Sequence, residues 1–283
     1  MKVINIFSAL IICLFFGACE EMNNVVNPGD KPVIEAYLAP GQIVSMKVFT
    51  EIPYSATDSA FSKPITDLAI KIELSDGKTF NLAHESDGIY KSTEKITGGV
   101  GTTIKMSFAH NGRTVSASTI IPPKPEGLSM DISEITRASR DFSTRPTPGQ
   151  GGGFLQEERT PVNVTWNNPE NVYHFLAAQS LEENPVSVVV FPTNGGFGPL
   201  PSRRFNNEPV QTTGSTLQSQ SFEYFGKYGI ILYRLNPDYA ALFVNNSTTS
   251  QNISTPISEI SNGLGIFTGI NADTLVFNVK KAN

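Results

Sequence analysis

Cysteine is nearly absent from this chain of 283 residues, which contains only two. Cys13 lies inside an apolar run near the amino terminus, and Cys19 directly follows Gly17-Ala18. The region after Cys19 therefore has no thiol pair and can form no internal disulfide. Its stability must come from burial of an apolar core, for which a chain of this length is sufficient.

A run of basic residues is also missing. The chain has 21 Lys and Arg residues against 26 Asp and Glu residues, a formal net charge of −5. Proteins that bind nucleic acids gather Lys and Arg on one face, because contacts with phosphates supply much of their affinity. We therefore expect no nucleic acid partner.

The residue groups that usually carry catalysis are scarce. The three histidines, His84, His110 and His174, lie far apart in the sequence, so they predict neither a metal site nor a cofactor site. The sequence contains no Gly-x-Ser-x-Gly motif, and no Cys/His pair is available after Cys19. The carboxylate pairs Glu157-Glu158 and Glu182-Glu183 would point to opposite faces of a strand. We expect the protein not to be an enzyme.

The amino terminus, by contrast, carries a clear signal. Lys2 precedes a mostly apolar run from Ile4 to Phe16, which is too short to span a membrane and closes on Gly17-Ala18-Cys19. Residues 1–18 are predicted to be a cleaved lipoprotein signal peptide, with lipid attached to Cys19; the alternative is an unmodified cysteine after an ordinary secretory cleavage site. Several acyl chains on one residue give a stable membrane anchor. Residues 19–32 are polar and predict a lipidated tether.

From Val33 onward, short β-type segments alternate with turn residues. The clearest is a predicted hairpin in which Ala69 to Leu74 and Thr79 to Leu82 flank the turn Asp76-Gly77. Pro122-Pro123-Lys124-Pro125 predicts a domain boundary, because successive prolines favour an extended connection. The sequence thus predicts an all-β fold with two antiparallel β-sandwich domains of the immunoglobulin-like type, the first spanning residues 33–122.

The second predicted β domain spans residues 126–283, with long loops at 139–160 and 192–220. Single strands are expected over Leu128 to Ile135 and Val186 to Phe191. One short helix is expected to begin at Asn236-Pro237, where Asn can cap and Pro suits the first helical position. The motif Asn262-Gly263-Leu264-Gly265 is interpreted as a turn with close backbone packing rather than a ligand site.

Several segments together resemble a lipoprotein family of Bacteroidota known only as domain of unknown function 4249. The resemblance covers nearly the whole chain after the signal peptide, and its motifs are Cys19, Val33 to Leu38, Pro64 to Ile72, Asp87-Gly88-Ile89-Tyr90, Ile120 to Pro123, Asn168 to Tyr173 and Ile260 to Phe267. The family has no assigned activity, so the resemblance assigns no functional residues.

The resemblance implies a location and a class of partner. Members look like outer-membrane proteins encoded beside TonB-dependent transporters, so an accessory role in nutrient capture or uptake is expected. Acidic residues close behind the lipidated cysteine favour passage to the outer face in that phylum, and Glu20-Glu21 is similar to such an export signal. The expected location is the outer membrane, lipid-anchored and facing the exterior.

A cluster of aromatic residues supports an alternative function. Phe197, Phe205 and Tyr224 lie within or just after a segment rich in Pro, Gly and Asn, with Phe222, Phe225 and Tyr228 nearby. If exposed, they would suit an independent adhesin or a glycan-binding module; if buried, they would fill a sandwich core.

Two short motifs are similar to the acceptor sequence for O-glycans on exported proteins of the same phylum. They are Asp58-Ser59-Ala60 and Asp273-Thr274-Leu275. Ser59, expected in a loop, is the better candidate, because Thr274 is expected to lie beside a strand.

Overall fold

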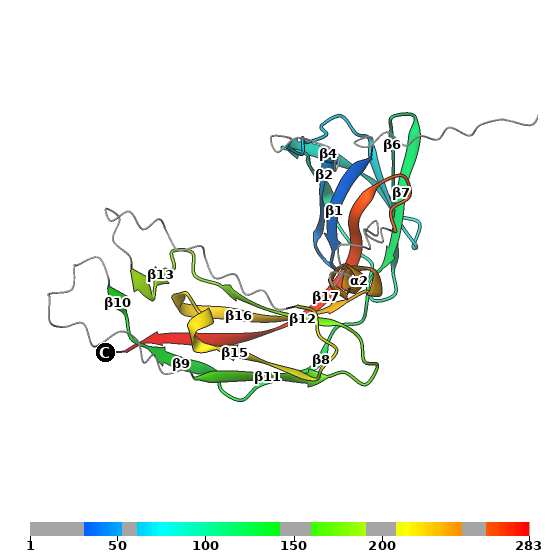
Figure 1. The fold of residues 1–283 in the computed structure, drawn as a ribbon. Coiled ribbons are helices and arrows are strands. Elements are labelled where there is room, and N and C mark those ends of the chain that lie inside the picture. Colours follow the sequence, from blue (N-terminus) through cyan, green and yellow to red (C-terminus); the bar gives the residue numbers. More distant parts are fainter. Residues whose placement is uncertain (1–30, 53–60, 142–159, 191–207, 245–258, 283) are drawn as a thin grey trace, which may run out of the picture.

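The computed structural model describes residues 31–52, 61–141, 160–190, 208–244 and 259–282. Within these ranges the chain is mostly β-strand with one short α-helix, which confirms the predicted fold class. Figure 1 shows the strands gathered into two lobes that meet at an angle, with the helix beside their junction. We call them the N-lobe and the C-lobe.

The N-lobe contains the first seven strands, in the antiparallel order β1-β2-β5-β4-β3-β6-β7. Their bounds are β1 Pro32–Leu38, β2 Ile43–Thr50, β3 Ile70–Leu74, β4 Thr79–Ser86, β5 Ile89–Lys95, β6 Thr103–His110 and β7 Arg113–Ile120. The predicted hairpin is confirmed as β3 and β4. Ile70, Ile72 and Leu74 are at most 2% exposed, whereas Lys71 and Glu73 between them face solvent. This alternation places one face of the sheet in the core.

The C-lobe is a sandwich of two layers. Its elements are β8 Glu126–Met130, β9 Glu134–Arg137, β10 Arg140–Asp141, β11 Pro161–Asn167, β12 His174–Ser180, β13 Val186–Ser187, β14 Val189–Val190, β15 Gly214–Gln218, the 3-10 turn η1 Ser219–Ser221, β16 Tyr224–Leu235, α2 Pro237–Val244 and β17 Leu264–Lys281. One layer has the order β12-β16-β17, and the other has the order β15-β11-β8. Trp166 of β11 lies in the core between them, together with Leu232 and Phe277.

Strand β17 belongs to both lobes, as the red ribbon in Figure 1 shows. Its first part, Leu264 to Gly269, pairs in parallel with β1, and Ile270 to Val279 pairs antiparallel with β16. Ile260 and Phe267 are buried in the N-lobe core. The prediction that residues 126–283 form one second domain is therefore wrong for Ile260 to Gly269, which belong to the N-lobe. Apolar patterning predicts that a residue is buried, but not which core it enters.

Four further predictions need correction. The expected strand over Leu128 to Ile135 is split into β8 and β9, and the one over Val186 to Phe191 contains the short strands β13 and β14. The expected loop at 192–220 includes β15. The sheets are also not entirely antiparallel. Parallel pairing joins β1 with β17, β9 with β17, and β10 with β14. The two strands of each parallel pair are distant in the sequence. The apolar pattern of a strand does not show whether its partner runs parallel or antiparallel to it.

Candidate functional site

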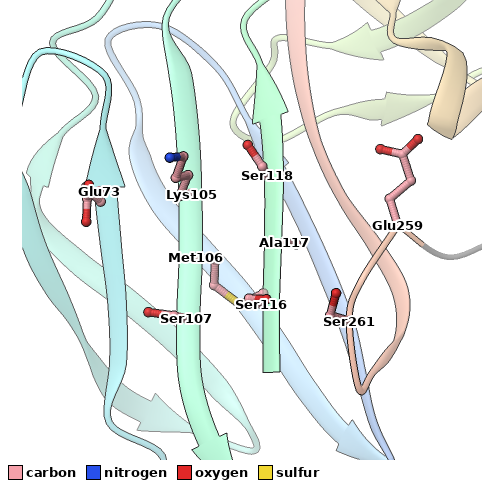
Figure 2. A pocket seen from close by; sticks show the side chains of 9 residues that line it. All are labelled: Glu73, Lys105, Met106, Ser107, Ser116, Ala117, Ser118, Glu259 and Ser261. Atoms are coloured by element: carbon pink, nitrogen blue, oxygen red, sulfur yellow. The ribbon is translucent and has the colours of Figure 1, made fainter. Parts of the chain in front are cut away.

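A shallow hollow of about 380 Å³ lies on the outer face of β3, β6 and β7, shown in Figure 2. It exists because alternate residues of these strands point outward and most of them are small. Its lining comes from these strands and from the segment before β17: Glu73, Lys105, Met106, Ser107, Ser116, Ala117, Ser118, Glu259 and Ser261. Ser261 is held there by paired backbone hydrogen bonds with Ser116, of 2.8 and 3.2 Å.

The hollow can offer hydrogen bonds but little else. Four serine hydroxyls, the Lys105 ammonium and two carboxylates line it, and Glu73 already lies 3.5 Å from the ammonium of Lys71. None of the lining residues is aromatic, so no ring is available for stacking on a sugar. None is a histidine that could activate a serine. In an open hollow, water competes for every hydrogen bond, so this site favours weak polar contacts rather than chemistry.

His174 is a buried histidine that serves the fold. His174 is 2% exposed, its ring lies 5.8 Å from that of Trp166, and its Nδ1 lies 3.2 Å from the carbonyl oxygen of Val172. Burial lowers the pKa of His174, which favours the neutral ring. Within the described ranges no group of three His, Cys, Asp or Glu side chains is arranged to hold a metal ion.

Most of the predicted site residues lie outside the described residues. These are Cys19, Glu20, Glu21, Ser59, Phe197 and Phe205. Tyr224 is half-buried at the start of β16, where its amide donates a 2.8 Å hydrogen bond to the hydroxyl of Tyr228.

Two interpretations were open for the aromatic residues around Tyr224. Phe222, Phe225 and Tyr228 are each at most 9% exposed, which confirms the core interpretation for these three. The ring of Phe222 stacks on Phe277, with 4.8 Å between centroids. Of the six aromatic residues in this group, Tyr224 is the one that the described residues leave partly exposed, and Phe197 and Phe205 lie outside them.

Thr274 lies inside β17 rather than beside a strand, paired with Ile231 of β16. Its side chain is exposed, and its amide donates a 2.9 Å hydrogen bond to the carboxylate of Asp273. Ser59, the candidate preferred from the sequence, lies outside the described residues.

The motif Asn262-Gly263-Leu264-Gly265 has the structural role that the sequence predicted. Asn262 and Gly265 have φ angles of +57° and +99°, and the side-chain amide of Asn262 donates a 2.8 Å hydrogen bond to the carbonyl oxygen of Thr114. A Cβ on Gly265 would lie 2.0 Å from the carbonyl oxygen of Ile34. The motif therefore joins β7 and β1 through the start of β17.

The junction between the lobes is a polar cluster that the sequence analysis missed. The side-chain amide of Asn236 donates hydrogen bonds to the carbonyl oxygens of Ile120, at 2.8 Å, and Gly269, at 3.0 Å, and to Oγ1 of Thr119, at 3.2 Å. The side-chain amide of Asn271 donates another to the carbonyl oxygen of Pro122 at 3.0 Å. Asn236 was expected only as a helix cap, and the sequence around Thr119 gives no sign of this partnership. The contacts hold the two lobes at a defined angle.

A second missed feature is the outer face of β12, β16 and β17. Phe175, Ala177, Ile231 and Tyr233 on this face are only partly buried. The sequence does carry a signal for this face, because consecutive residues of β12 and of β16 are apolar. Such a run of apolar residues is typical of a strand that is covered on both sides.

No described helix is long and apolar enough to cross a membrane. A comparison with curated proteins finds no match. Among solved structures, a segment of two fibronectin type-III domains from chicken tenascin is 11% identical and covers 88% of this chain and 99% of that chain, with a TM-score of 0.22. Extracellular domains 3–5 of Drosophila OTK are 9% identical and cover 89% of this chain and 64% of that one, with a TM-score of 0.17.

The family comparison is the informative one. The model of the domain of unknown function DUF4249 matches residues 21–275, which include both lobes and the greater part of β17. This chain belongs to the DUF4249 family.

Proposed function

We propose that this protein is a non-enzymatic lipoprotein, anchored in the outer membrane through Cys19 and facing the exterior, that acts as an accessory partner of a TonB-dependent transporter in nutrient capture or uptake. The observation that carries the proposal is the sequence Gly17-Ala18-Cys19 and its polar tether, directly ahead of a chain built from two joined β lobes. The partner class comes from the family resemblance, and the outward orientation from Glu20-Glu21.

The joined lobes suit a binding role. Because β17 pairs with both β1 and β16, and Asn236 bonds across the junction, little conformational freedom is left to lose when a partner binds. A preorganised surface loses less entropy on association than a flexible one. The tether, in contrast, can let the rigid part reach a neighbour in the same membrane.

The non-enzymatic part of the proposal rests on the sequence and on the hollow. The sequence offers no nucleophile motif, and the serines in the hollow have no histidine beside them. A protein of this kind would contribute by contact and positioning.

Co-purification tests the proposal. The protein, with a tag after Asn283, would be produced in its own host and isolated from detergent-solubilised outer membranes, with Cys19→Ser as the variant that loses the anchor. We expect a TonB-dependent transporter barrel to be enriched with the anchored protein. The proposal is overturned if the anchored protein reaches the outer membrane and no such barrel accompanies it.

A further inference from the structure

The predicted tether enters the fold at the end of the N-lobe that lies away from the junction. Strand β1 begins there at Pro32 and runs toward the junction, where Leu38 pairs with Gly269 of β17. The amide of Glu51 donates a 3.2 Å hydrogen bond to the carbonyl oxygen of Lys31, the first described residue. We call this end of the N-lobe the distal end.

Two exposed apolar side chains, Ile52 and Phe61, lie at the distal end. The amide of Thr50, which ends β2, donates a 2.8 Å hydrogen bond to the carbonyl oxygen of Lys63, and the hydroxyl of Ser62 donates one of 2.7 Å to the carbonyl oxygen of Thr50. The same antiparallel register, continued by two residues, sets Ile52 opposite Phe61. Their side chains are 49% and 80% exposed, so both face solvent beside the entry of the tether.

This pair stands apart from the other exposed apolar side chains of the N-lobe. The others lie toward the junction, and they are Tyr37, Ile43, Val100 and Ile120. Phe61 is more exposed than any of them. Single apolar residues on a surface are ordinary, but neighbouring ones at the point where a membrane anchor joins the fold indicate an interaction site.

The surroundings of the pair suit a lipid surface. Lys31 and Lys63 belong to the bonded segments beside it, and a lysine can lay its stem along an apolar surface while its ammonium stays among phosphates. Glu51 is the acidic residue of the same segments. Aromatic and aliphatic side chains with basic neighbours are the usual equipment of proteins that lie in the boundary between headgroups and acyl chains.

We infer that the distal end of the N-lobe rests on the lipid bilayer, with Ile52 and Phe61 inserted between the headgroups. The inference rests on the proposed function, because the anchor at Cys19 brings this end to the membrane. Twelve residues lead from Cys19 to Lys31, and an extended chain of that length spans at most about 40 Å. A tethered surface meets the bilayer as an intramolecular partner, so even a weak contact is populated.

The contact would also orient the protein. Strand β17 leaves the N-lobe at Gly269, at the opposite end from the bilayer contact, and continues through the C-lobe to Lys281. The C-lobe would therefore be held away from the lipid, where a partner can reach it. The lipid on Cys19 and the apolar pair act together, and two weak membrane signals hold a protein more firmly than one.

Quenching of tryptophan emission by brominated lipids tests this inference. The chain from Cys19 to Asn283 has one thiol, which would be coupled to a maleimide lipid in phosphatidylcholine vesicles with brominated acyl chains. In the Phe61→Trp variant, the added emission should fall by about half or more, because a side chain inserted ~5–10 Å deep reaches the acyl chains. Val100→Trp, 59% exposed at the junction end, is the matched control and should keep its emission.

The native Trp166 provides an internal reference. It is 3% exposed in the C-lobe core, so its emission should be unquenched in every variant and should report that this lobe is folded. Ile52→Asp, added to Phe61→Trp, should remove most of the quenching, since a carboxylate is costly to move out of water. Ile43→Asp, at the junction end of β2, should leave the quenching unchanged.

The inference is overturned if Phe61→Trp is quenched no more than Val100→Trp, or if Ile52→Asp has no effect. It is equally overturned if the emission of Phe61→Trp changes only when a transporter barrel is added to the vesicles, because the pair would then bind protein. The anchor in this experiment is attached chemically. An unmodified Cys19 in the host would therefore overturn the proposed function, whereas absence of quenching would overturn this inference alone.

Discussion

The amide of Gly269 donates a 2.8 Å hydrogen bond to Oγ1 of Thr119, a residue 150 positions earlier in the chain. Thr119 is the next-to-last residue of β7, and Gly269 is the point where β17 passes from β1 toward β16. Both residues are buried. This bond fixes the position at which one strand leaves the first lobe and enters the second.

Replacement of Thr119 by Val should destabilise the protein. The change keeps the shape of the side chain but removes the oxygen that accepts from Gly269 and Asn236. A buried donor without an acceptor costs about 1–3 kcal/mol. Urea unfolding of Thr119→Val should show a decrease of this size in the free energy of unfolding. Thr114→Val, at an exposed position of the same strand, is the matched control and should change the free energy of unfolding by less than about 0.5 kcal/mol. Equal stability of the two variants would refute the role of this bond.

Gly265→Ala should be more damaging. The new Cβ would lie 2.0 Å from the carbonyl oxygen of Ile34, at a residue whose φ angle of +99° already disfavours any side chain. Strain and clash together should lower the free energy of unfolding by about 3 kcal/mol or more. Gly99→Ala meets no atom within 4 Å and should change it by less than about 1 kcal/mol. Denaturation curves of both variants check this, and a Gly265→Ala protein as stable as the control would contradict the close strand packing.

Residues 31–122 alone should not fold cooperatively. Their core would lack Ile260 and Phe267, and β1 would lose its parallel partner. Burial of one phenylalanine contributes about 1.5–3 kcal/mol, a large fraction of the ~5–15 kcal/mol that stabilises a domain. A peptide of residues 259–270 should restore dispersed NMR signals to the fragment. The same peptide with Phe267→Ser should fail to do so. Cooperative unfolding of the fragment without any peptide would show that the N-lobe is complete by itself.

Alkaline pH should weaken the folded state partly through Tyr228. Burial raises the pKa of its phenol to about 12, whereas an unfolded tyrosine ionises near 10. Between these pH values the folded state keeps a proton that the unfolded state releases, so stability falls as pH rises from about 10 to 12. In this pH window the free energy of unfolding of Tyr228→Phe should therefore fall less steeply with pH. The difference in slope should correspond to at most one bound proton. Urea midpoints at several pH values measure the slope, and parallel curves for the two proteins would disprove the assignment.

The sequence was sufficient for the elements whose pattern is local. The hairpin of β3 and β4 follows from Ile70, Ile72 and Leu74 on one face and from the Asp76-Gly77 turn, and α2 begins at Pro237 as expected. The turn at Asn262-Gly263-Leu264-Gly265 was likewise predicted. These features depend on neighbouring residues only.

Features that depend on distant pairing could not be predicted in the same way. Nothing near Phe267 indicates that it enters the N-lobe core, and Asn236 carries a capping signal that says nothing of its bonds to Ile120 and Gly269. The sequence of β16 also does not show which side chains stay partly exposed, because Ile230 and Ile231 are both apolar although only Ile230 is fully buried. Apolar patterning does not distinguish a residue that the fold covers fully from one that it leaves partly exposed.

The membrane anchor is the premise of the proposed function, and the mass of the mature amino terminus tests it most directly. The protein would be extracted from membranes of its own host with detergent and digested, and its first peptide would be analysed by mass spectrometry. We predict a peptide that begins at Cys19, with a diacylglycerol on the thiol and an acyl chain on the amine. A peptide with an unmodified Cys19, or one that still contains residues 1–18, would contradict the proposal.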